Sequence, residues 1–451
     1  MKIRIDGTLD YHQNKQHLAH AFSVPAGTTK LTIRFEYSPR TSQGQPQRND
    51  LSLTLFDPQR SRGARHNNQD RNLTITTYSA TPGYRPGALQ PGIWTVWIDT
   101  HRVLPSDIIS YFFEIETSDE AVEPVEAWKK GSTAPRGAGW YRGDLHGHTF
   151  HSDGRWDVPD LVQYARDYKL DFVTLSDHNT VSGLAQLDSF RSDDLLTIGG
   201  MELTTYYGHA LALGVREWIE WRIGVGSTTM PELADRARQA GATFIIAHPM
   251  SVGDPYCTGC DWAYEDMMPG NGRCVEVWNS EWDGDRQNEL SLQLWYCWLN
   301  QGYRMVGTRG SDIHRPTDDA NAGFDIVYAA ELSETAILEA IRAGHLYLSS
   351  GPHLELTAQG SAGASGRMGD LVPGQSIQIN FAWHDCAETD HVRLIVDGKR
   401  VNEFPSGAQG QHQWTLKPEE AHWCVAEIRA ANGDLHAVTN PIFMGSAADW
   451  R

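Results

Sequence analysis

The chain has 451 residues, and 57 acidic against 38 basic side chains give it a formal net charge of −19. Proteins that bind nucleic-acid backbones or anionic membrane surfaces need clustered Lys and Arg, so this charge argues against both kinds of partner. At about 100–200 residues per domain, the length predicts two to four domains, each able to bury a core.

A content of 40% hydrophobic and 21% charged residues is typical of a globular protein. No apolar run reaches the roughly 18 residues that a transmembrane helix needs. Six cysteines are too few for a disulfide scaffold in so long a chain. The start, Met1 to Asp6, has no apolar stretch of the signal-peptide type, which predicts a cytoplasmic protein. Export stays open, because a mature form given a new Met would begin in the same way.

The N-terminal part, residues 1–128, is expected to be all β. Apolar and polar residues alternate at 30–37, 51–56 and 94–98, and Pro- and Gly-rich turns separate these segments. Short strands at this spacing predict a β-sandwich domain. A Lys-, Gly- and Ser-containing linker follows at 129–139.

Strands and helices alternate in residues 139–350. Short apolar strands are predicted at 172–175, 195–198, 243–247, 274–278, 304–307 and 324–328, and helices at 158–169, 230–240 and 333–344. With a first strand before His146, about seven βα units result, a number suited to a βα barrel. The pattern alone does not separate a barrel from a doubly wound sheet.

Residues 352–451 return to β alternation, for example at 392–399, where Asp397-Gly398 is a hairpin signal. A second, smaller β-sandwich domain is expected there. The fold class is therefore α/β, with a central βα domain between two β domains.

Polar side chains gather where the central strands end. Two His at positions i and i+2 of an extended segment, such as His146 and His148, point to one face and can bind one ion. Asp312 and His314 repeat this spacing with a carboxylate. Imidazole and carboxylate together suit Zn, Mn or Fe. The complete set of candidates is His146, His148, Asp153, His178, Glu202, His209, His248, Asp312 and His314.

The alternative interpretation is that these residues are ordinary caps and turns. A single His-x-His is common by chance, and an Asp after a strand is usually a helix cap or turn residue. Five such clusters within one domain, each directly after a predicted strand, are hard to obtain from caps alone. The joint interpretation as a metal site is therefore preferred.

These motifs resemble a known family. The run from His146 to Gly154, with Ser176-Asp177-His178, Gly200-Met201-Glu202, His248-Pro249 and Ser311-Asp312-Ile313-His314, resembles the PHP (polymerase and histidinol phosphatase) superfamily. The arrangement of β domains on both sides is similar to the CehA/McbA branch, named after carbaryl hydrolase.

The resemblance implies a distorted (β/α)7 TIM-like barrel that holds two to three divalent transition-metal ions (Mn, Zn or Fe). By motif, the first ion would be bound by His146, His148, Glu202 and Asp312. Glu202 would bridge to a second ion held by His209 and His248, and a third would be held by Asp153, His178 and His314. Family members carry either His or Asp at the position of Asp153, so the third site is expected to be weaker.

Such a site predicts a hydrolase that uses a metal-bridging hydroxide. We expect a phosphoesterase acting on a small-molecule phosphomonoester or phosphodiester. Two alternatives are a carbamate or carboxyl-ester hydrolase of the carbaryl-hydrolase type and a non-enzymatic, metal-stabilised binding protein. The binding protein is disfavoured because every family ligand position carries a side chain that can bind a metal. A homo-oligomer is also possible.

Further residues near these motifs are candidates for catalysis and substrate binding. Asp177 and His151 are candidate proton carriers, although a supporting role for Asp177 and an exposed turn for His151 are the alternatives. Arg155, Asn279 and Arg315 are candidate substrate contacts, with a solvated surface role as the alternative for each Arg.

A long loop at 251–271 is expected to form a lid at the mouth of the site. It contains an isolated Cys257-Thr258-Gly259-Cys260 motif. Without a second pair or His partners, this motif is weak support for a zinc site, and weaker still for a redox function.

Overall fold

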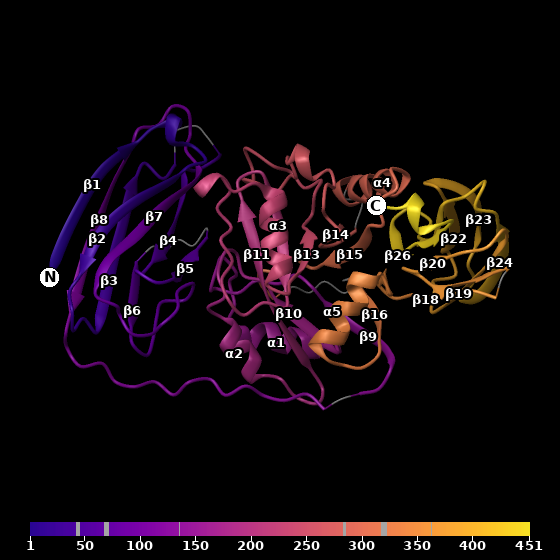
Figure 1. Cartoon of the computed structure of the whole chain (residues 1–451), viewed down its shortest axis with the longest axis horizontal. Coiled ribbons are helices and arrows are strands. Elements are labelled where there is room, and N and C mark those ends of the chain that lie inside the picture. The colour runs from indigo at the N-terminus through magenta and orange to yellow at the C-terminus, as the bar shows by residue number, and fades with distance from the viewer. Residues whose placement is uncertain (42–45, 67–71, 135, 283–285, 317–322, 362) are drawn as a thin grey trace.

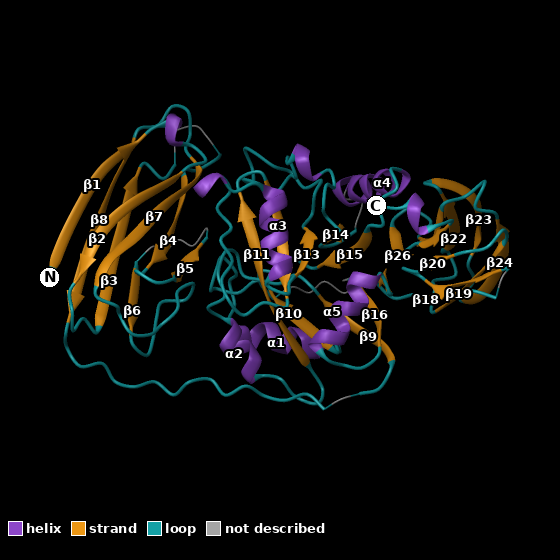
Figure 2. Ribbon diagram, in the orientation of Figure 1, coloured by secondary structure: helices purple, strands orange, loops and turns teal. Residues whose placement is uncertain are grey.

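The computed structural model describes residues 1–41, 46–66, 72–134, 136–282, 286–316, 323–361 and 363–451. Three groups of elements follow one another along the long axis of the molecule, in chain order (Figure 1). Strands greatly outnumber helices, and the helices gather around the middle group (Figure 2). The chain is thus a mixed α/β protein with several sheets. None of the helices in the described ranges combines the length and hydrophobicity that a membrane crossing needs.

The N-terminal strands form two antiparallel four-stranded sheets. One has the order β1 (Lys2–Leu9), β8 (Ile109–Ser118), β3 (Lys30–Ser38), β6 (Leu73–Thr76), and the other β2 (His17–Val24), β7 (Gly92–Arg102), β4 (Asp50–Phe56), β5 (Ser61–Arg65). Alternate residues of β3 are buried, including Leu31, Ile33 and Phe35. They share one hydrophobic core with Trp94 and Val96 of the second sheet, so the alternation in the sequence places one face of each sheet inside.

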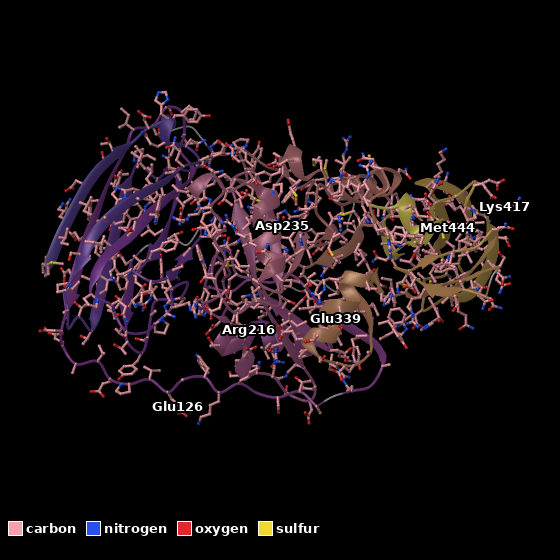
Figure 3. All side chains as sticks on the ribbon, viewed as in Figure 1. Glu126, Arg216, Asp235, Glu339, Lys417 and Met444 are labelled. Atoms are coloured by element: carbon pink, nitrogen blue, oxygen red, sulfur yellow. A yellow bond between two sulfur atoms is a disulfide. The ribbon has the colours of Figure 1, made fainter. Side chains whose placement is uncertain are left out.

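Residues 119–138 connect β8 to β9, and the described residues among them form neither helix nor strand. The connection runs along the outside of the molecule (Figure 1), and Glu126 marks its course in Figure 3. Of the predicted linker at 129–139, residues 129–134 and 136–138 lie in this connection and Gly139 begins β9, whereas residue 135 is outside the described residues.

The central strands follow each other in space in the order of the chain. This order is β9 (Gly139–Asp144), β10 (Phe172–Leu175), β11 (Leu196–Thr205), β12 (Gly208–Leu213), β13 (Thr243–Ile246), β14 (Cys274–Asn279), β15 (Val306–Gly310). All neighbouring pairs are parallel except those of β12, which is antiparallel to β11 and to β13. The parallel pairs bring the carboxyl ends of these strands to one edge.

In the described part of the chain, five α-helices accompany these strands. They are α1 (Val158–Asp167), α2 (Leu184–Ser189), α3 (Met230–Gln239), α4 (Arg286–Asn300) and α5 (Glu334–Ala343). The predicted helices are confirmed by α1, α3 and α5, and their ends follow from local chemistry. Asp157 and Asp160 form a capping box at the start of α1. Ser333 caps α5, and Gly344 ends it in the left-handed region at φ 78°.

The hydrogen-bonded path of strands stays open within the described ranges. The second edge of β9 pairs with the antiparallel strand β16 (Phe324–Ala329) and not with β15. A single parallel bridge between Gly147 and Ile313 joins the two ends of the path beyond the strands. The strands of the predicted barrel are therefore present, but their hydrogen-bonded pairing does not close into a ring within the described ranges.

The central sheet continues into the C-terminal strands. From β16 it passes to β17 (Leu346–Ser349), β26 (Leu435–Thr439), β25 (Trp423–Arg429), β22 (His391–Val396) and β23 (Lys399–Pro405), with β20 (Leu371–Val372) and β27 (Ile442–Met444) attached beside this path. A separate sheet contains β19 (Ser365–Arg367), β18 (His353–Gly360), β21 (Ile377–His384) and β24 (Gln409–Leu416). The predicted hairpin is confirmed, because Asp397 and Gly398 have φ of 47° and 74° between β22 and β23. The three predicted domain ranges stay predictions.

Asn440 connects the central and C-terminal strands. Its side-chain amide donates to the carbonyls of Gly307 and Leu346 at 2.8 and 3.0 Å, and its oxygen accepts from the Gly307 N–H at 2.8 Å. The side chain is buried.

Asn440→Ala would leave these buried backbone groups without partners, so we expect the free energy of unfolding to fall by about 2–4 kcal/mol. Chemical denaturation checks this, with Asn402→Ala on the exposed strand β23 as control. Equal stability of the two variants would contradict the assigned role.

Candidate metal centre

The predicted ligands meet at the edge where the central strands end. His146 and His148 follow β9, His178 follows β10, and Glu202 lies in β11. His209 comes from β12, His248 follows β13, and Asp312 and His314 follow β15. Asp153 lies in the turn between His148 and α1. Residues far apart in the sequence are thereby brought into one cluster, which confirms the expectation that these strand ends converge.

Glu202 lies at the centre of this cluster and is fully buried. Nitrogen atoms of five imidazoles lie within 3.3 Å of its two carboxylate oxygens. Oε2 faces His178 Nδ1 at 2.8 Å, His146 Nε2 at 3.2 Å and His148 Nε2 at 3.3 Å, and Oε1 faces His209 Nδ1 at 3.0 Å and His248 Nε2 at 3.3 Å. One carboxylate thus contacts five ligand candidates that come from the ends of four strands, β9, β10, β12 and β13, as a bridging ligand would.

A second part of the cluster lies nearer to solvent. Potential donor atoms of His148, Asp153, His178 and His314 all lie within 4.8 Å of one another. Asp153 Oδ1 is 3.4 Å from His178 Nε2 and 3.2 Å from His314 Nε2. Asp312 Oδ1 lies 3.0 Å from His148 Nε2. The side chains of Asp312 and His314 are 24% and 32% exposed, so the cluster opens to solvent on this side.

Several nitrogen and oxygen atoms that could bind a metal are buried and have no hydrogen-bond partner among the described residues. They are His146 Nε2, His148 Nε2, His209 Nδ1, Glu202 Oε2 and Asp153 Oδ1. Buried polar atoms without partners are rare in folded proteins and are unfavourable. Here they face one another, and together they offer the nitrogen and oxygen ligands that suit Zn, Mn or Fe. The residues therefore fit divalent transition-metal ions.

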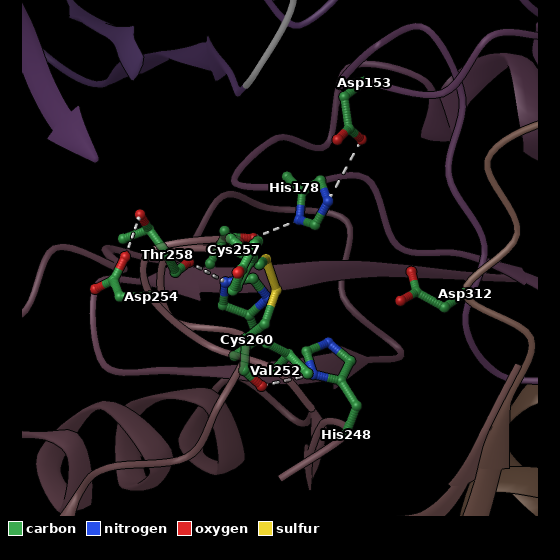
Figure 4. The surroundings of a disulfide bond; sticks show 12 residues. Asp153, His178, His248, Val252, Asp254, Cys257, Thr258, Cys260 and Asp312 are labelled. Carbon is green, nitrogen blue, oxygen red and sulfur yellow. Dashed lines mark hydrogen bonds and ion pairs between the residues drawn. A yellow bond between two sulfur atoms is a disulfide. The ribbon is translucent and has the colours of Figure 1, made fainter. Parts of the chain in front are cut away.

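The outer nitrogen atoms of two of these imidazoles are held by one turn of the chain. His209 Nε2 donates to the Thr258 carbonyl at 3.2 Å, and His248 Nδ1 donates to the Cys260 carbonyl at 3.0 Å (Figure 4). Because the outer nitrogen donates to a carbonyl, the nitrogen left for metal binding in each ring is the one that faces Glu202. Hydrogen bonds of this kind fix the tautomer and orientation of metal-binding His.

Glu276 of β14 performs the same task for His146, and sequence analysis did not identify it. Its Oε1 accepts from His146 Nδ1 at 2.8 Å, and its Oε2 accepts from the His248 backbone N–H at 3.0 Å. Glu276 is 1% exposed. A carboxylate within the apolar strand Cys274–Asn279 was the available signal, because a buried acid requires partners.

The charges in the cluster influence one another strongly. Burial opposes ionisation of Glu202, but the surrounding imidazoles, His178 and His146 foremost, hold its pKa well below the usual range. Burial and the neighbouring rings of His178 and His314 lower the pKa of His148 to about 3. At neutral pH, Glu202 is thus ionised and His148 is neutral, which are the forms that bind metals.

Two ligand candidates have a strained backbone. His248 has φ of 28° and Asp312 has φ of 53°, which side chains other than glycine rarely adopt. Such residues cost about 1–3 kcal/mol each and persist where the surroundings impose them, often at functional sites. The fold therefore holds both residues in the conformation that directs them into the cluster.

The predicted catalytic residues lie beside the ligands, Asp177 directly before His178 and His151 in the turn after His148. Asp177 is buried and accepts from the Thr149 N–H, the Thr149 hydroxyl and the Ser152 hydroxyl, each at 2.7 Å. Burial raises its pKa. His151 Nδ1 lies 2.7 Å from the hydroxyl of Ser182. Both side chains thus stabilise the 149–152 turn after His148, and their catalytic roles stay predictions.

The predicted substrate contacts differ in their surroundings. Arg155 and Arg315 are exposed and directly follow the ligand motifs of Asp153 and His314. The backbone N–H of Arg155 donates to the His314 carbonyl at 2.6 Å, which joins the two segments. Asn279 is half-buried, and its side-chain amide donates to Glu276 at 3.3 Å. The backbone of both Arg residues thus lies next to the outer part of the cluster, and Asn279 lies beside Glu276; their substrate contacts stay predictions.

The N-terminal strands also reach the cluster, through residues that sequence analysis did not identify. The ring of His66, just after β5, lies 4.9 Å from the ring of His178, centroid to centroid. His66 Nδ1 is 3.2 Å from His101 Nε2 on β7, and the Ser52 hydroxyl lies 2.8 Å from the same atom. Burial lowers the pKa of both His66 and His101 well below the usual range. The N-terminal sheets thus cover one side of the site with neutral imidazoles.

The cysteines of the Cys257-Thr258-Gly259-Cys260 motif form a disulfide. The motif is therefore not a thiolate zinc site in this structure. Sequence spacing could not reveal this pairing, because a Cys-x-x-Cys motif is equally typical of metal sites and of disulfides.

Known proteins are similar to this chain at low sequence identity or over part of their length. No family model matches the chain. An uncharacterized protein of Methanocaldococcus jannaschii is 28% identical over 119 residues, which are 25% of this chain, and the match spans about half (48%) of that relative's length.

Two solved structures are similar in part. One is a two-domain protein from Bacteroides vulgatus with a predicted PHP-like metal-dependent phosphoesterase (14% identity, TM-score 0.39, 71% of this chain and 100% of that chain). The other, from Bifidobacterium adolescentis, is assigned as a metal-dependent phosphoesterase (18% identity, TM-score 0.28, 38% of this chain and 87% of that chain). Likenesses of this size do not establish a function, so the function is argued from the site.

The protonation of the cluster predicts that metal binding releases protons. Burial opposes protonation of His248 and His314, but Glu202 raises the pKa of the first to about 9 and Asp153 that of the second to about 10. Both rings are therefore protonated at pH 7 without metal, and a metal must displace these protons. We expect metal affinity to rise between pH 7 and pH 9. Calorimetric titration at pH 7 in two buffers of different ionisation enthalpy should give different apparent enthalpies, and equal enthalpies would contradict this assignment.

Proposed function

We propose that the protein is a metal-dependent hydrolase of the PHP type and, more specifically, a phosphoesterase that acts on a small phosphomonoester or phosphodiester. The observation that carries this proposal is the buried Glu202 carboxylate among the inward-facing ring nitrogens of five imidazoles. A binding protein stabilised by metal would need fewer ligands and no open side. This site combines a complete ligand set with exposure at Asp312 and His314.

Two or three divalent ions would be held by the ligand cluster. The structure groups the ligands slightly differently from the motif assignment, because His178 lies near Glu202 and His209 as well as near Asp153. When bound, such ions lower the pKa of coordinated water and neutralise charge on an ester. No Ser or Cys nucleophile is required in a hydrolase of this type.

The residues of the chain itself would bind, orient and shield the substrate. Arg155 and Arg315 are exposed and follow the ligand motifs in the chain, and in this proposal their guanidinium groups donate paired hydrogen bonds to a phosphate at the open side. His66 and the N-terminal sheets cover the side near His178 and exclude water there. An anionic substrate would thus approach from the side of His314, with both Arg side chains nearby, and this approach favours a phosphoester over a neutral carbamate.

In this proposal the catalytic unit is the barrel-like part at 139–350, flanked by the β domains at 1–128 and 352–451. Glu276, Thr258 and Cys260 would orient the ligands from outside. Asp177 and His151 would stabilise the turn that carries His148 and Asp153.

Glu202→Gln tests the proposed function directly. An amide carries no charge and cannot bridge two ions as a carboxylate does, so we expect loss of at least one bound ion and a fall in activity of at least about 100-fold. Metal content would be measured by elemental analysis after growth with Mn or Zn. Hydrolysis would be measured with nitrophenyl phosphate, bis-nitrophenyl phosphate and nitrophenyl acetate side by side.

The matched control is Glu339→Gln on the exposed face of α5, a residue labelled in Figure 3. The control should keep its metal content and activity. Less than one ion per chain in the native protein would refute the metal site, and a faster reaction with the carboxyl ester than with either phosphate would favour the carbamate- or ester-hydrolase alternative.

Asp153→Ala tests the division of the ligands among ions. Asp153 contacts His178 and His314 at the outer part of the cluster and lies apart from Glu202. We expect the variant to lose one weak metal-binding step and to keep the tight steps at Glu202, with activity lowered but not abolished. A metal titration monitored by calorimetry measures this. Loss of the tight steps would place Asp153 in the inner pair of sites.

A further inference from the structure

The Cys257–Cys260 disulfide lies directly against the ligand cluster. Its two cysteines are half-buried at the surface of the loop between β13 and β14, while Thr258 and Gly259 between them are buried. Figure 4 shows the disulfide together with His248, whose Nδ1 donates to the Cys260 carbonyl. The bond therefore closes a four-residue turn whose outer side is open to reagents in solvent and whose inner side faces the site.

The inner side of this turn supplies the two carbonyls that orient ligand imidazoles. The Thr258 carbonyl accepts from His209 Nε2, and the Cys260 carbonyl accepts from His248 Nδ1. Both rings contact the same oxygen, Oε1 of Glu202. The remaining ligands take their support elsewhere: His146 from Glu276, and His314 from the Asp312 carbonyl at 2.7 Å. The turn thus serves one metal position of the cluster.

Gly259 shows how closely the turn fits the site. It has φ of 76°, in the left-handed region. A Cβ atom there would lie 2.1 Å from the Thr205 carbonyl oxygen and 3.2 Å from His209 Nε2. A glycine is therefore required both by the conformation and by the approach to β11, and little displacement of the turn is possible without moving His209.

The flank of the turn that precedes Cys257 is held by other contacts. The Thr258 hydroxyl donates to Asp254 Oδ1 at 3.0 Å, and Asp254 forms an ion pair with Lys15 of the N-terminal part. Arg102 of β7 donates to the Pro255 carbonyl at 2.6 Å. These contacts hold residues 254–258, whereas the disulfide joins Cys257 to Cys260, whose carbonyl accepts from His248.

We propose that the Cys257–Cys260 disulfide positions His209 and His248 for metal binding, and that its reduction by a dithiol weakens the metal position formed by Glu202, His209 and His248. The inference rests on the proposed function, since it concerns the same site. In the step, the dithiol transfers two electrons and two protons to the S–S bond, which breaks into two thiols while the reductant becomes a disulfide. Activity would then depend on the redox state of the surroundings.

The test uses the full-length protein in a Cys297→Ser background. Cys297 is the exposed free cysteine, and the free cysteines Cys274, Cys386 and Cys424 are buried. The protein is reduced with excess dithiol, alkylated with iodoacetamide and freed of reagents, and mass spectrometry counts two added groups. The control omits the reductant. Mn and Zn affinities are measured by competition with a chromophoric chelator, so that the readout does not depend on activity.

We expect reduction to weaken one metal-binding step by about 10- to 100-fold, the range typical for lost partners of ligand residues. The other steps and the melting temperature of the metal-free protein should change little. Cys257→Ser with Cys260→Ser, without alkylation, should give the same result and so exclude an effect of the alkyl groups. Reoxidation of reduced, unalkylated protein should restore the lost affinity. Gly259→Ala, which keeps both cysteines, should weaken the same step.

The outcomes separate this inference from the proposed function. Unchanged metal affinity after reduction and in the double Ser variant would overturn the positioning role and leave the hydrolase proposal intact. A protein that hydrolyses no ester would refute the proposed hydrolase function. If the same protein binds metal tightly and loses affinity on reduction, the positioning role of the disulfide is supported. An oxidised protein that binds no metal would overturn both.

Discussion

The site depends on the burial of one carboxylate among imidazoles. Transfer of a carboxylate from water to a protein interior is unfavourable by several kcal/mol unless opposite charges compensate it. Glu202 has no exposed surface, and the nearest partners of its oxygens are ring nitrogens. In the metal-free state these rings supply protons, and in the metal-bound state the ions supply the charge. The same arrangement thus makes the folded protein tolerate Glu202 and gives it affinity for divalent ions.

This constraint explains why the support of the site comes from so many parts of the chain. An imidazole binds metal with one nitrogen only if a partner outside the cluster holds the proton on the other. Glu276 provides that partner for His146, and the disulfide-closed turn provides it for His209 and His248. The N-terminal strands add His66 behind His178. The chemistry of the cluster therefore requires the tertiary structure around it, and not the central strands alone.

Local patterns in the sequence predict the elements and the ligands, but not the contacts between distant parts. Alternation locates β3, a short apolar run locates β10, and capping residues mark the ends of α1 and α5, since these signals act within a few residues. The ligands follow from polar residues at strand ends. The sequence pattern does not indicate the strand β12, which carries His209, because β12 starts only three positions after the end of β11 and opens with Gly208 and the polar His209. The partners Glu276 and His66 depend on which strands become neighbours, and no local rule specifies this. The same holds for the continuation of the central sheet through β17 into β26.

That continuation has a consequence for how the protein forms during synthesis. β17 ends at Ser349, whereas its partner β26 begins at Leu435. A ribosome therefore releases every strand and ligand of the metal site well before the strand that covers the edge of β17. Until then the edge presents unpaired N–H and C=O groups, which are a template for association with other chains. The C-terminal strands thus cover the edge of a nascent sheet within the same molecule. A chain that ends before residue 435 would contain all metal-ligand candidates but would expose an unpaired strand edge that favours aggregation.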